Sequence, residues 1–284
     1  MKLIRLIWKV ILDILPKNKL GDNLIFFISF LQTHHRFPFP KRQLINDELY
    51  RIKTGSEIES PLRVFTTDKE YVKEYVKAIV GDRYNVGTID ILRSKTDIDS
   101  YEFPKRCCIK PTHASGKLII RRDGENLPLK DIKGWLDLNY YHISRERNYK
   151  NLIPKIIVEP LVFESENIVD FKFFCYFGKV KFIQLDLDRT TNHTRRYYDC
   201  DWNPLNFTIN YPLSNRIVKK PSCLKEMISI CKKLSNPFSL VRLDLYTNGS
   251  KFFVGEITHC SDSAIGKFLP KKSEYIASEM LFSD

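Results

Sequence analysis

Two short apolar segments near the carboxyl end of the chain carry charged residues at regular positions. Val241–Tyr246 and Val254–Thr258 flank a turn built around Thr247-Asn248-Gly249. Apolar segments on either side of an Asn-Gly turn are typical of two adjacent antiparallel strands. This pairing constrains the fold more than any other segment, because it predicts which charged side chains share one face of a sheet.

The charged residues of this hairpin have the chemistry of a metal–phosphate site. Arg242 and Asp244 are two residues apart on the first strand and therefore point the same way, and Glu256 lies on the second strand. Magnesium prefers hard oxygen ligands, often one or two carboxylates with substrate phosphates, and arginine neutralises the remaining charge. On these residues alone, an ordinary hairpin with an exposed charged face is an equally good interpretation.

A second candidate segment spans residues 103–120. A short strand there ends in Lys110, and a loop of small residues that includes Ser115, Gly116 and Lys117 leads into the next strand. Small residues let backbone N–H groups approach an anion, and lysines add positive charge. The segment predicts a flap over phosphates, although a loop with one glycine is also compatible with a plain connection.

Two further strands carry polar groups at or near their ends. The buried pattern of residues 155–158 ends at Glu159, which Pro160 and Leu161 follow. Asp170 and Lys172 share a face of the next strand, which a Phe-Gly-Lys turn joins to its return strand. Both segments therefore add charged side chains to strands that are otherwise apolar.

Five motifs follow one another in a fixed order along the chain. They are Lys110-Pro111 with its small-residue loop, Val158-Glu159-Pro160-Leu161, Asp170-Phe171-Lys172, Arg242-Leu243-Asp244 and Gly255-Glu256-Ile257-Thr258. In this order they resemble the ATP-grasp superfamily, and more narrowly its TupA-like branch, typified by a teichuronopeptide-biosynthesis protein. The similarity runs from about Leu62 to the C-terminus. It implies an α+β fold in which two α+β lobes hold ATP between antiparallel sheets, with a helical N-terminal extension.

The resemblance also implies a role for each matching residue. In the nucleotide site it assigns the phosphates to Lys110 and to the loop of Ser115, Gly116 and Lys117, the adenine to Glu159, Pro160 and Leu161, and the ribose to Asp170 with Lys172 beside it. In the metal site it assigns two Mg²⁺ ions to Asp244 and Glu256, and the transferred phosphate to Arg242, which acts with Lys110 in catalysis. Thr258 stands where many ATP-grasp ligases carry asparagine. Its hydroxyl is a third candidate metal ligand, or else satisfies nearby backbone.

Four parts of the chain are expected. They are a helical N-terminal extension over 1–60, an α/β segment over 61–100, a small lobe with the phosphate loop over 101–155 and a large lobe with the Mg-ATP site over 156–284. Within the second part, Thr67 and Glu70 have the spacing of a capping box, which predicts a helix that ends at Gly81.

A polar stretch at residues 186–198 is expected to be a long loop between strands, and loops of that length are often functional. It holds Arg189, His193, Arg195 and Arg196, whose side chains are candidates for binding an acidic sugar or an acyl phosphate. Of these four residues, Arg196 is also a candidate catalytic residue. An exposed connection without a ligand is the alternative.

The overall charge indicates anionic partners. The 284 residues carry a formal net charge of +12, which suits a nucleotide, an acidic polysaccharide, an anionic lipid or a nucleic acid. Nucleic acid is set aside, because most aromatic residues lie within predicted strands and are not interleaved with surface Lys and Arg. The seven cysteines lack metal-binding spacing and indicate reduced thiols in the cytoplasm.

The amino terminus has the pattern of an amphipathic helix. Met1–Leu15 places Lys2, Arg5 and Lys9 on a narrow cationic side. Its apolar run is shorter than the roughly 18 residues of a membrane span, and no signal-peptide cleavage pattern follows. Two interpretations stay open: packing on its own protein, and peripheral contact of residues 1–15 with the inner face of the cell membrane.

The resemblance implies an ATP-dependent carboxylate–amine ligase that forms an amide through an acyl phosphate and releases ADP. It points to an amino acid, a peptide or another amine joining a uronic acid of a cell-surface polysaccharide or its precursor, as in capsule, O-antigen or teichuronopeptide. A kinase-like ATP-grasp phosphotransferase and a glycosyltransferase-pathway protein acting on the same polysaccharide remain alternatives, because the sequence does not show what attacks the acyl phosphate. Sugar transfer would need a nucleotide-sugar site, and the Gly-x-Gly-x-x-Gly motif after a strand that would indicate such a site is not visible in the sequence.

Overall fold

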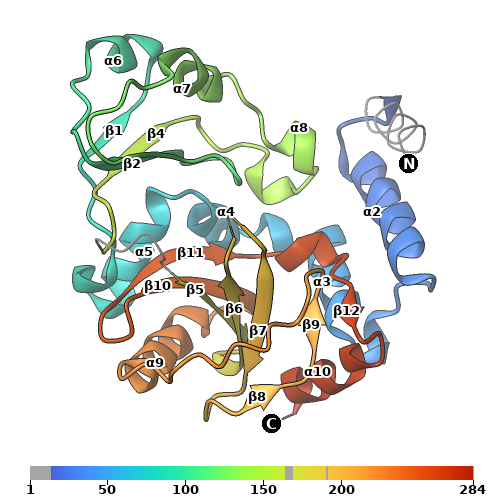
Figure 1. Ribbon diagram of the computed structural model, residues 1–284. Coiled ribbons are helices and arrows are strands. Elements are labelled where there is room, and N and C mark those ends of the chain that lie inside the picture. Colours follow the sequence, from blue (N-terminus) through green and yellow to red (C-terminus); the bar gives the residue numbers. More distant parts are fainter. Residues whose placement is uncertain (1–13, 164–168, 190, 284) are drawn as a thin grey trace.

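The computed structural model describes residues 14–163, 169–189 and 191–283. The expected membrane contact of residues 1–15 therefore lies almost entirely outside the described residues. Figure 1 shows a large body that holds the longer strands and a smaller lobe that rises above it. The expected α+β class with antiparallel sheets is confirmed. Within the described ranges, every helix is too short or too polar to cross a bilayer.

Short helices and strands alternate along the chain. The α-helices are α2 (Lys19–His34), α3 (Ile45–Thr54), α4 (Pro61–Thr67), α5 (Tyr71–Val80), α6 (Lys95–Ser100), α7 (Leu129–Leu136), α8 (Tyr141–Ser144), α9 (Leu224–Ser235) and α10 (Ser273–Phe282). The 3-10 turns are η1 (Pro40–Arg42), η2 (Glu57–Glu59), η3 (Asp82–Tyr84), η4 (Arg147–Tyr149) and η5 (Ser261–Ala264). The strands are β1 (Asp90–Leu92), β2 (Cys107–Pro111), β3 (Ile119–Arg121), β4 (Ile156–Glu159), β5 (Val169–Tyr176), β6 (Lys179–Leu187), β7 (Thr194–Tyr198), β8 (Pro204–Leu205), β9 (Thr208–Ile209), β10 (Leu240–Thr247), β11 (Phe252–Thr258) and β12 (Phe268–Leu269).

The large body is built on a six-stranded antiparallel sheet of order β11-β10-β5-β6-β7-β8. Both predicted hairpins are present: β10 pairs with β11, and β5 pairs with β6. The turn between β5 and β6 contains Phe177 and Gly178, which have φ angles of 43° and 73°, as a two-residue hairpin turn of this kind requires. Helices α5 and α9 cover one face of the sheet over an apolar core that includes Met227, Leu185 and Leu243.

The opposite face of this sheet divides into an apolar half and a charged half. Phe174, Phe182 and Tyr197 on the apolar half pack against residues of α3 and α10, among them Leu49 and Leu281. The charged half lies toward the smaller lobe, because Lys110 of β2 interacts with Tyr246 of β10. The segment expected as an N-terminal extension thus contributes α3 to the core of the body.

The smaller lobe contains a four-stranded antiparallel sheet of order β1-β4-β2-β3. It has its own apolar core, which includes Cys107, Ile109 and Ile132. The boundary expected between residues 155 and 156 falls directly before β4, and so separates β4 from the strands β1 and β2 with which it pairs. The sheet is one continuous stretch of chain whose first and last strands are neighbours, because Asp90 lies opposite Val158.

The polar stretch at residues 186–198 is not a loop throughout, which corrects the expectation. Residues 194–198 form β7, which pairs with β6 along its whole length. Alternate residues of a strand face opposite sides. Arg195 and Tyr197 therefore face one side of the sheet, and Arg196 and Tyr198 the other. The sequence does not reveal this strand, because both of its sides carry polar groups.

The start of α5 also differs from the expected capping box. The helix does span residues 71–80 and ends at Gly81, which has φ of 97°. Thr67, however, is the last residue of the preceding helix α4. The Glu70 carboxylate pairs with Lys155 and Arg93 and so is not available to cap the helix. The Glu70 side chain therefore binds the buried Lys155 instead of capping α5.

Candidate active site

Charged side chains from five neighbouring strands gather on one half of a sheet face. Because residues two apart on a strand point the same way, the charged positions of the strands align across the sheet. Asp244 on β10 lies opposite Lys172 on one side and Glu256 on the other. The residues on this face are Asp170 and Lys172 of β5, Gln184 and Asp186 of β6, Arg195 of β7, Arg242 and Asp244 of β10, and Glu256 and Thr258 of β11.

Arg242 and Asp244 form a bidentate ion pair at the centre of this face. The Arg242 Nε and Nη2 atoms each donate to an Asp244 carboxylate oxygen over 2.7 Å. Nη2 also donates to Thr258 Oγ1 (3.2 Å), and Nη1 to the Ser261 hydroxyl (2.9 Å). Burial alone would raise the pKa of Asp244, but Arg242 and Lys172 outweigh burial and lower that pKa. Asp244 is therefore an anion at neutral pH, as a metal ligand must be.

Lys172 connects three carboxylates. Its Nζ lies 3.2 Å from Asp244 Oδ2 and 3.4 Å from an oxygen of both Asp170 and Asp186. Burial alone would lower the pKa of Lys172, but these carboxylates, Asp244 first, raise it. The contact confirms that Asp170 and Lys172 share a face. Their assignment to a nucleotide stays a prediction.

The carboxylate of Glu256 is half-buried and open. It makes no hydrogen bond or ion pair with any residue that the structure describes. Lys69 and Arg242 are near enough to interact with it electrostatically. In the described ranges no three histidine, cysteine or acidic side chains form a metal cluster. Two adjacent carboxylates nevertheless match the usual protein share of a magnesium site, which phosphates complete.

Lys110 and Glu159 face this sheet from the smaller lobe. The Lys110 ammonium on β2 pairs with Glu159 on β4, and the other Glu159 oxygen lies 2.5 Å from the Nζ of Lys73. Burial alone would lower the pKa of Lys110, but Glu159 reverses this and raises it. Lys110 also interacts with Tyr246 of β10, so it reaches the large sheet. Lys73, on α5, was not predicted because its segment matches no phosphate motif.

The predicted phosphate loop joins β2 to β3 and is open to solvent. Ser115, Gly116 and Lys117 are all exposed, and Gly116 has φ of +73° with open space where a Cβ would lie. The base of the loop is attached to the body, because the Nζ of Lys69 donates to the Ala114 carbonyl over 2.6 Å. Lys69 is a second site residue that sequence reasoning missed, since only the fold brings it near Glu256.

The structure separates two arginines that the sequence grouped together. Arg195 is buried on the charged face, where its Nε donates to Asp186 Oδ1 over 2.9 Å and its Nη1 to the Ile209 carbonyl over 2.8 Å. Arg196 lies on the opposite face and donates to the Ser214 carbonyl over 3.3 Å. The expectation that Arg196 joins Arg242 and Lys110 is therefore wrong in geometry, because adjacent strand residues point apart.

The remaining candidates border this site. Pro160, which is exposed, and Leu161, which is half-buried, directly follow β4. Two nearby histidines are structural: His113 contacts the carbonyls of Trp135 and Leu138, and His259 contacts Thr66 and Arg63. Burial, and for His259 also the charge of Arg63, lowers the pKa of both imidazoles. Neither histidine reaches the charged face as a base.

Comparisons with known proteins were made for the whole chain. A family model described as TupA-like ATPgrasp matches residues 50–281. No curated protein sequence matches at a significant level. Similar solved structures include the ATP-grasp ligase PsnB complexed with minimal precursor (TM-score 0.39, 12% identity, 71% of this chain and 54% of that chain). They also include the D-alanine-D-alanine ligases from Helicobacter pylori (0.42, 11%, 78% and 60%) and, complexed with ATP, from Bacillus anthracis (0.38, 14%, 76% and 62%). The chain thus spans between 54% and 62% of the length of these three proteins.

Proposed function

This chain belongs to the TupA-like ATP-grasp family, and on that premise we propose that it is an ATP-dependent ligase that joins a carboxylate to an amine. One observation supports the proposal most directly. Arg242 and Lys172 hold Asp244 as an anion, while the adjacent Glu256 carboxylate makes no bond within the described residues. Two anionic oxygen donors beside a guanidinium suit a magnesium-bound polyphosphate.

In this proposal the phosphates of ATP lie between the two sheets. Lys110 and, on the exposed loop, Ser115, Gly116 and Lys117 approach them from the smaller lobe. Lys110 then exchanges its bond with Glu159 for one with a phosphate oxygen, and Glu159 keeps Lys73 as its partner. A charge-assisted bond of this kind retains the stabilisation of the buried ammonium group.

With the phosphates in this position, the adenine and the ribose of ATP also have proposed partners. Glu159, Pro160 and Leu161 border the adenine at the end of β4, and Asp170 takes the ribose hydroxyls. Asp170 already accepts from Lys172 and Arg189, so its carboxylate is held in place for that contact. Lys172 has the further role of linking the ribose end of the site to Asp244.

Asp244 and Glu256 would hold magnesium in this proposal, and phosphate oxygens would complete the ligand set of one or two ions. The donor chemistry fits, because both groups are carboxylates on one face of paired strands. The Thr258 hydroxyl already accepts from Arg242, which leaves it a weaker third ligand. When bound, magnesium offsets the negative charge of the phosphates and polarises the transferred group.

The chemistry then needs two displacements. A carboxylate oxygen attacks the γ-phosphorus of ATP, and the bond to the bridging oxygen breaks, which releases ADP. The amine nitrogen attacks the carbonyl carbon of the acyl phosphate, the carbon–oxygen bond to phosphate breaks, and the nitrogen loses a proton. Arg242 is positioned beside Asp244 to stabilise the charge on the transferred phosphate in both steps.

The carboxylate is proposed to belong to a uronic acid of a cell-surface polysaccharide or its precursor. The net charge of +12 and the exposed Arg189 at the edge of the site support an acidic acceptor. All seven cysteines are free thiols, which supports a location in the cytoplasm. Contact of residues 1–15 with the inner face of the membrane belongs to the same proposal.

Product analysis tests this function. The protein is incubated with Mg-ATP, a mixture of amino acids and uronic-acid glycans, and ADP, AMP, phosphate and the glycan mass are measured. The expected result is stoichiometric ADP and phosphate with a glycan heavier by one amine less water. Stoichiometric AMP would exclude the acyl-phosphate route. A stable phosphorylated product with no amide would indicate a phosphotransferase.

A further inference from the structure

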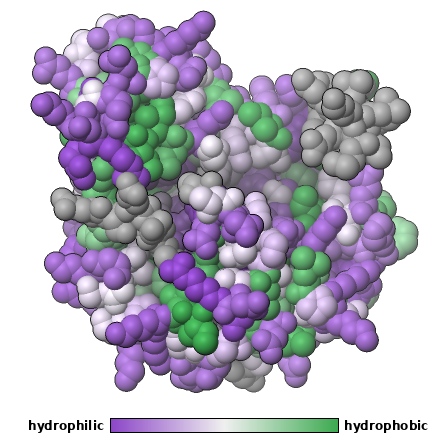
Figure 2. Space-filling view, viewed as in Figure 1, coloured by the Kyte–Doolittle hydropathy of each residue, from purple (hydrophilic) through white to green (hydrophobic). Residues whose placement is uncertain are grey.

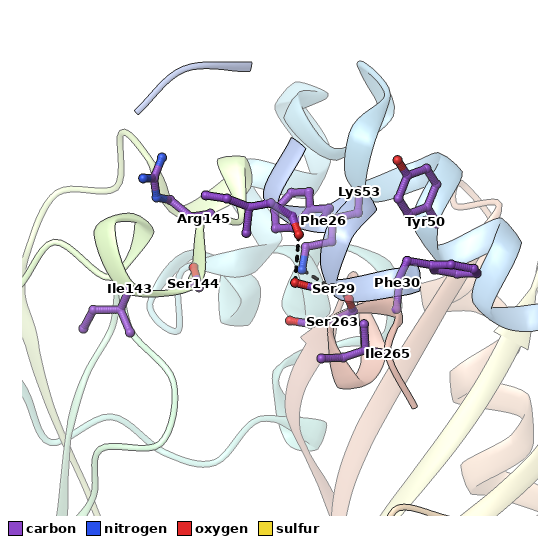
Figure 3. Close-up of a pocket in the computed structure, with 12 residues that line it drawn as sticks. Phe26, Ser29, Phe30, Tyr50, Lys53, Ile143, Ser144, Arg145, Ser263 and Ile265 are labelled. Atoms are coloured by element: carbon purple, nitrogen blue, oxygen red, sulfur yellow. Dashed lines mark hydrogen bonds between the residues drawn. The ribbon is translucent and has the colours of Figure 1, made fainter. Parts of the chain in front are cut away.

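A cavity of about 230 Å³ lies between α2, α3, α8 and the turn η5. Figure 3 shows Ser29, Lys53 and Ser263 meeting at its centre, with Ile143 and Ser144 across from them. We propose that this cavity is the subsite for the amine substrate, and that this substrate is a free α-amino acid with a compact apolar side chain. The inference rests on the proposed ligase function and names one of its two substrates.

The wall of the cavity combines apolar and cationic chemistry. Phe26, Phe30 and Tyr50 line it from α2 and α3, and the Lys53 ammonium, only 3% exposed, lies 3.8 Å from the Phe26 ring centroid. Burying an ammonium group costs free energy unless it is paired. A wall of this kind is suited to a ligand that has an apolar part and a carboxylate.

Lys53 has an incomplete set of partners among the described residues. Its Nζ donates to the Ser263 carbonyl over 3.2 Å, but it lies 3.6 Å from Glu146 Oε1. A charge-assisted hydrogen bond is shorter, about 2.7–2.9 Å. Lys53 and Glu146 therefore form an ion pair without a hydrogen bond, and a zwitterion can bind between them, with its carboxylate on Lys53 and its ammonium group on Glu146. Glu146 is oriented by a bond from the Ser263 hydroxyl (2.5 Å).

The cavity is connected to the charged face through η5. Ser263 lines the cavity, and Ser261, two residues earlier, accepts from Arg242 over 2.9 Å. Two residues span at most about 7 Å, so η5 connects the wall of the cavity to the residue that binds Arg242. Glu146 borders the cavity through its contacts with the lining residues Ser263 and Lys53, and Tyr149 interacts electrostatically with both Glu146 and Glu256.

The backbone conformation of η5 also supports a binding site at the cavity. Asp262, Ser263 and Ala264 have φ of 47°, 55° and 61°, and left-handed conformations are unfavourable for non-glycine residues. Such backbone persists where surrounding contacts fix it, and it is concentrated at functional sites. Here the contacts are the Asn210–Asp262 bond (2.9 Å) and the Ser263–Glu146 bond.

The volume limits the size of the ligand. Each water molecule occupies roughly 30 Å³ in the liquid, so 230 Å³ holds about eight molecules of that size. This matches an amino acid with a side chain such as that of leucine. An oligopeptide or an oligosaccharide exceeds the space, so a peptide would enter with its terminal residue only.

Calorimetry with L-leucine as the probe tests the subsite. The full chain is titrated in the presence of magnesium and a non-hydrolysable ATP analogue. Two matched analogues, 4-methylpentanoate and 3-methylbutylamine, each lack one charge of the zwitterion and should bind at least tenfold more weakly, because each loses one ion pair. Lys53→Met should weaken leucine by a similar factor and leave 3-methylbutylamine unchanged. Equal affinities for all three compounds, or no leucine binding to the parent protein, would overturn the inference.

The second arm of the test uses a variant whose side chain fills the cavity. Ser29→Phe places a ring in the space, with Ser29→Ala as the control that removes the hydroxyl alone. The first variant should lose leucine binding and raise the KM for the amine by at least tenfold, while affinity for the ATP analogue is unchanged in both. If amide forms and Ser29→Phe keeps the parent KM, the subsite is wrong and the ligase stands. If no amide forms but leucine binding is lost in Ser29→Phe, the ligase proposal fails and the subsite stands.

Discussion

Asp244 and Glu256 have the same proposed function but different surroundings, which makes their variants separable. Glu256→Gln removes a negative ligand that bonds to no described residue, so turnover should fall by at least about 100-fold while the free energy of unfolding changes by less than about 0.5 kcal/mol. Asp244→Asn should lose turnover as well, and also about 3 kcal/mol of stability, because Arg242 and Lys172 lose their buried partner. ADP release and urea unfolding measure the two effects. Full activity of either variant contradicts the metal assignment.

His259 predicts a pH dependence of stability. Burial first, and Arg63 second, hold its pKa well below the ordinary value. Between that lowered pKa and about 6.5 the unfolded chain binds a proton that the folded chain does not, so stability falls as the pH falls. The folded protein should therefore lose stability through this residue between pH 7.0 and pH 5.5.

Urea unfolding at both pH values checks this. His259→Gln should reduce the difference in unfolding free energy between the two pH values, whereas replacing the exposed His35 by Gln should leave that difference unchanged. An unchanged difference in His259→Gln would mean that the imidazole is protonated in the folded protein.

At the scale of elements, β7 divides its two arginines between opposite faces of the sheet. Arg195→Gln should raise the KM for the acidic acceptor by about tenfold or more, since Arg195 belongs to the charged face and a guanidinium pairs with carboxylates in a bidentate manner. Arg196→Gln, one residue away, should leave that KM unchanged. Steady-state kinetics with ATP held saturating measures both, and equal effects would show that surface charge alone attracts the acceptor.

The elements also show what the sequence could predict. The β10–β11 hairpin and the Phe177-Gly178 turn were predictable, because turn chemistry and alternating residues are local. β7 was not, since Arg195 and Arg196 make both of its sides polar, and a polar run has no apolar period to detect. Lys69 and Lys73 belong to the α4–α5 region and reach Ala114 and Glu159 only through packing of the two bodies. Such long-range neighbours leave no signal in a single sequence.

At the scale of the whole molecule, the exposed loop of residues 115–117 should report on the nucleotide. Trypsin should cleave the free protein after Lys117, and magnesium with a non-hydrolysable ATP analogue should slow that cleavage at least tenfold, because bound phosphates order the loop between the lobes. Lys251, exposed in the β10–β11 turn, is the control site and should be cut at the same rate in both conditions. Equal protection of both lysines would indicate global stabilisation instead of loop closure.

Because Asp90 and Val158 are neighbours, the smaller lobe can be exchanged as one unit. Its chain leaves and re-enters the body at neighbouring strands, so a relative's lobe can be grafted between these two points without rerouting the rest of the polypeptide. The contacts that a graft must preserve include those of Lys155 with Asp68 and Glu70, and of Arg147 with Glu59. Chimaeras assembled at this junction can therefore combine one lobe with different bodies.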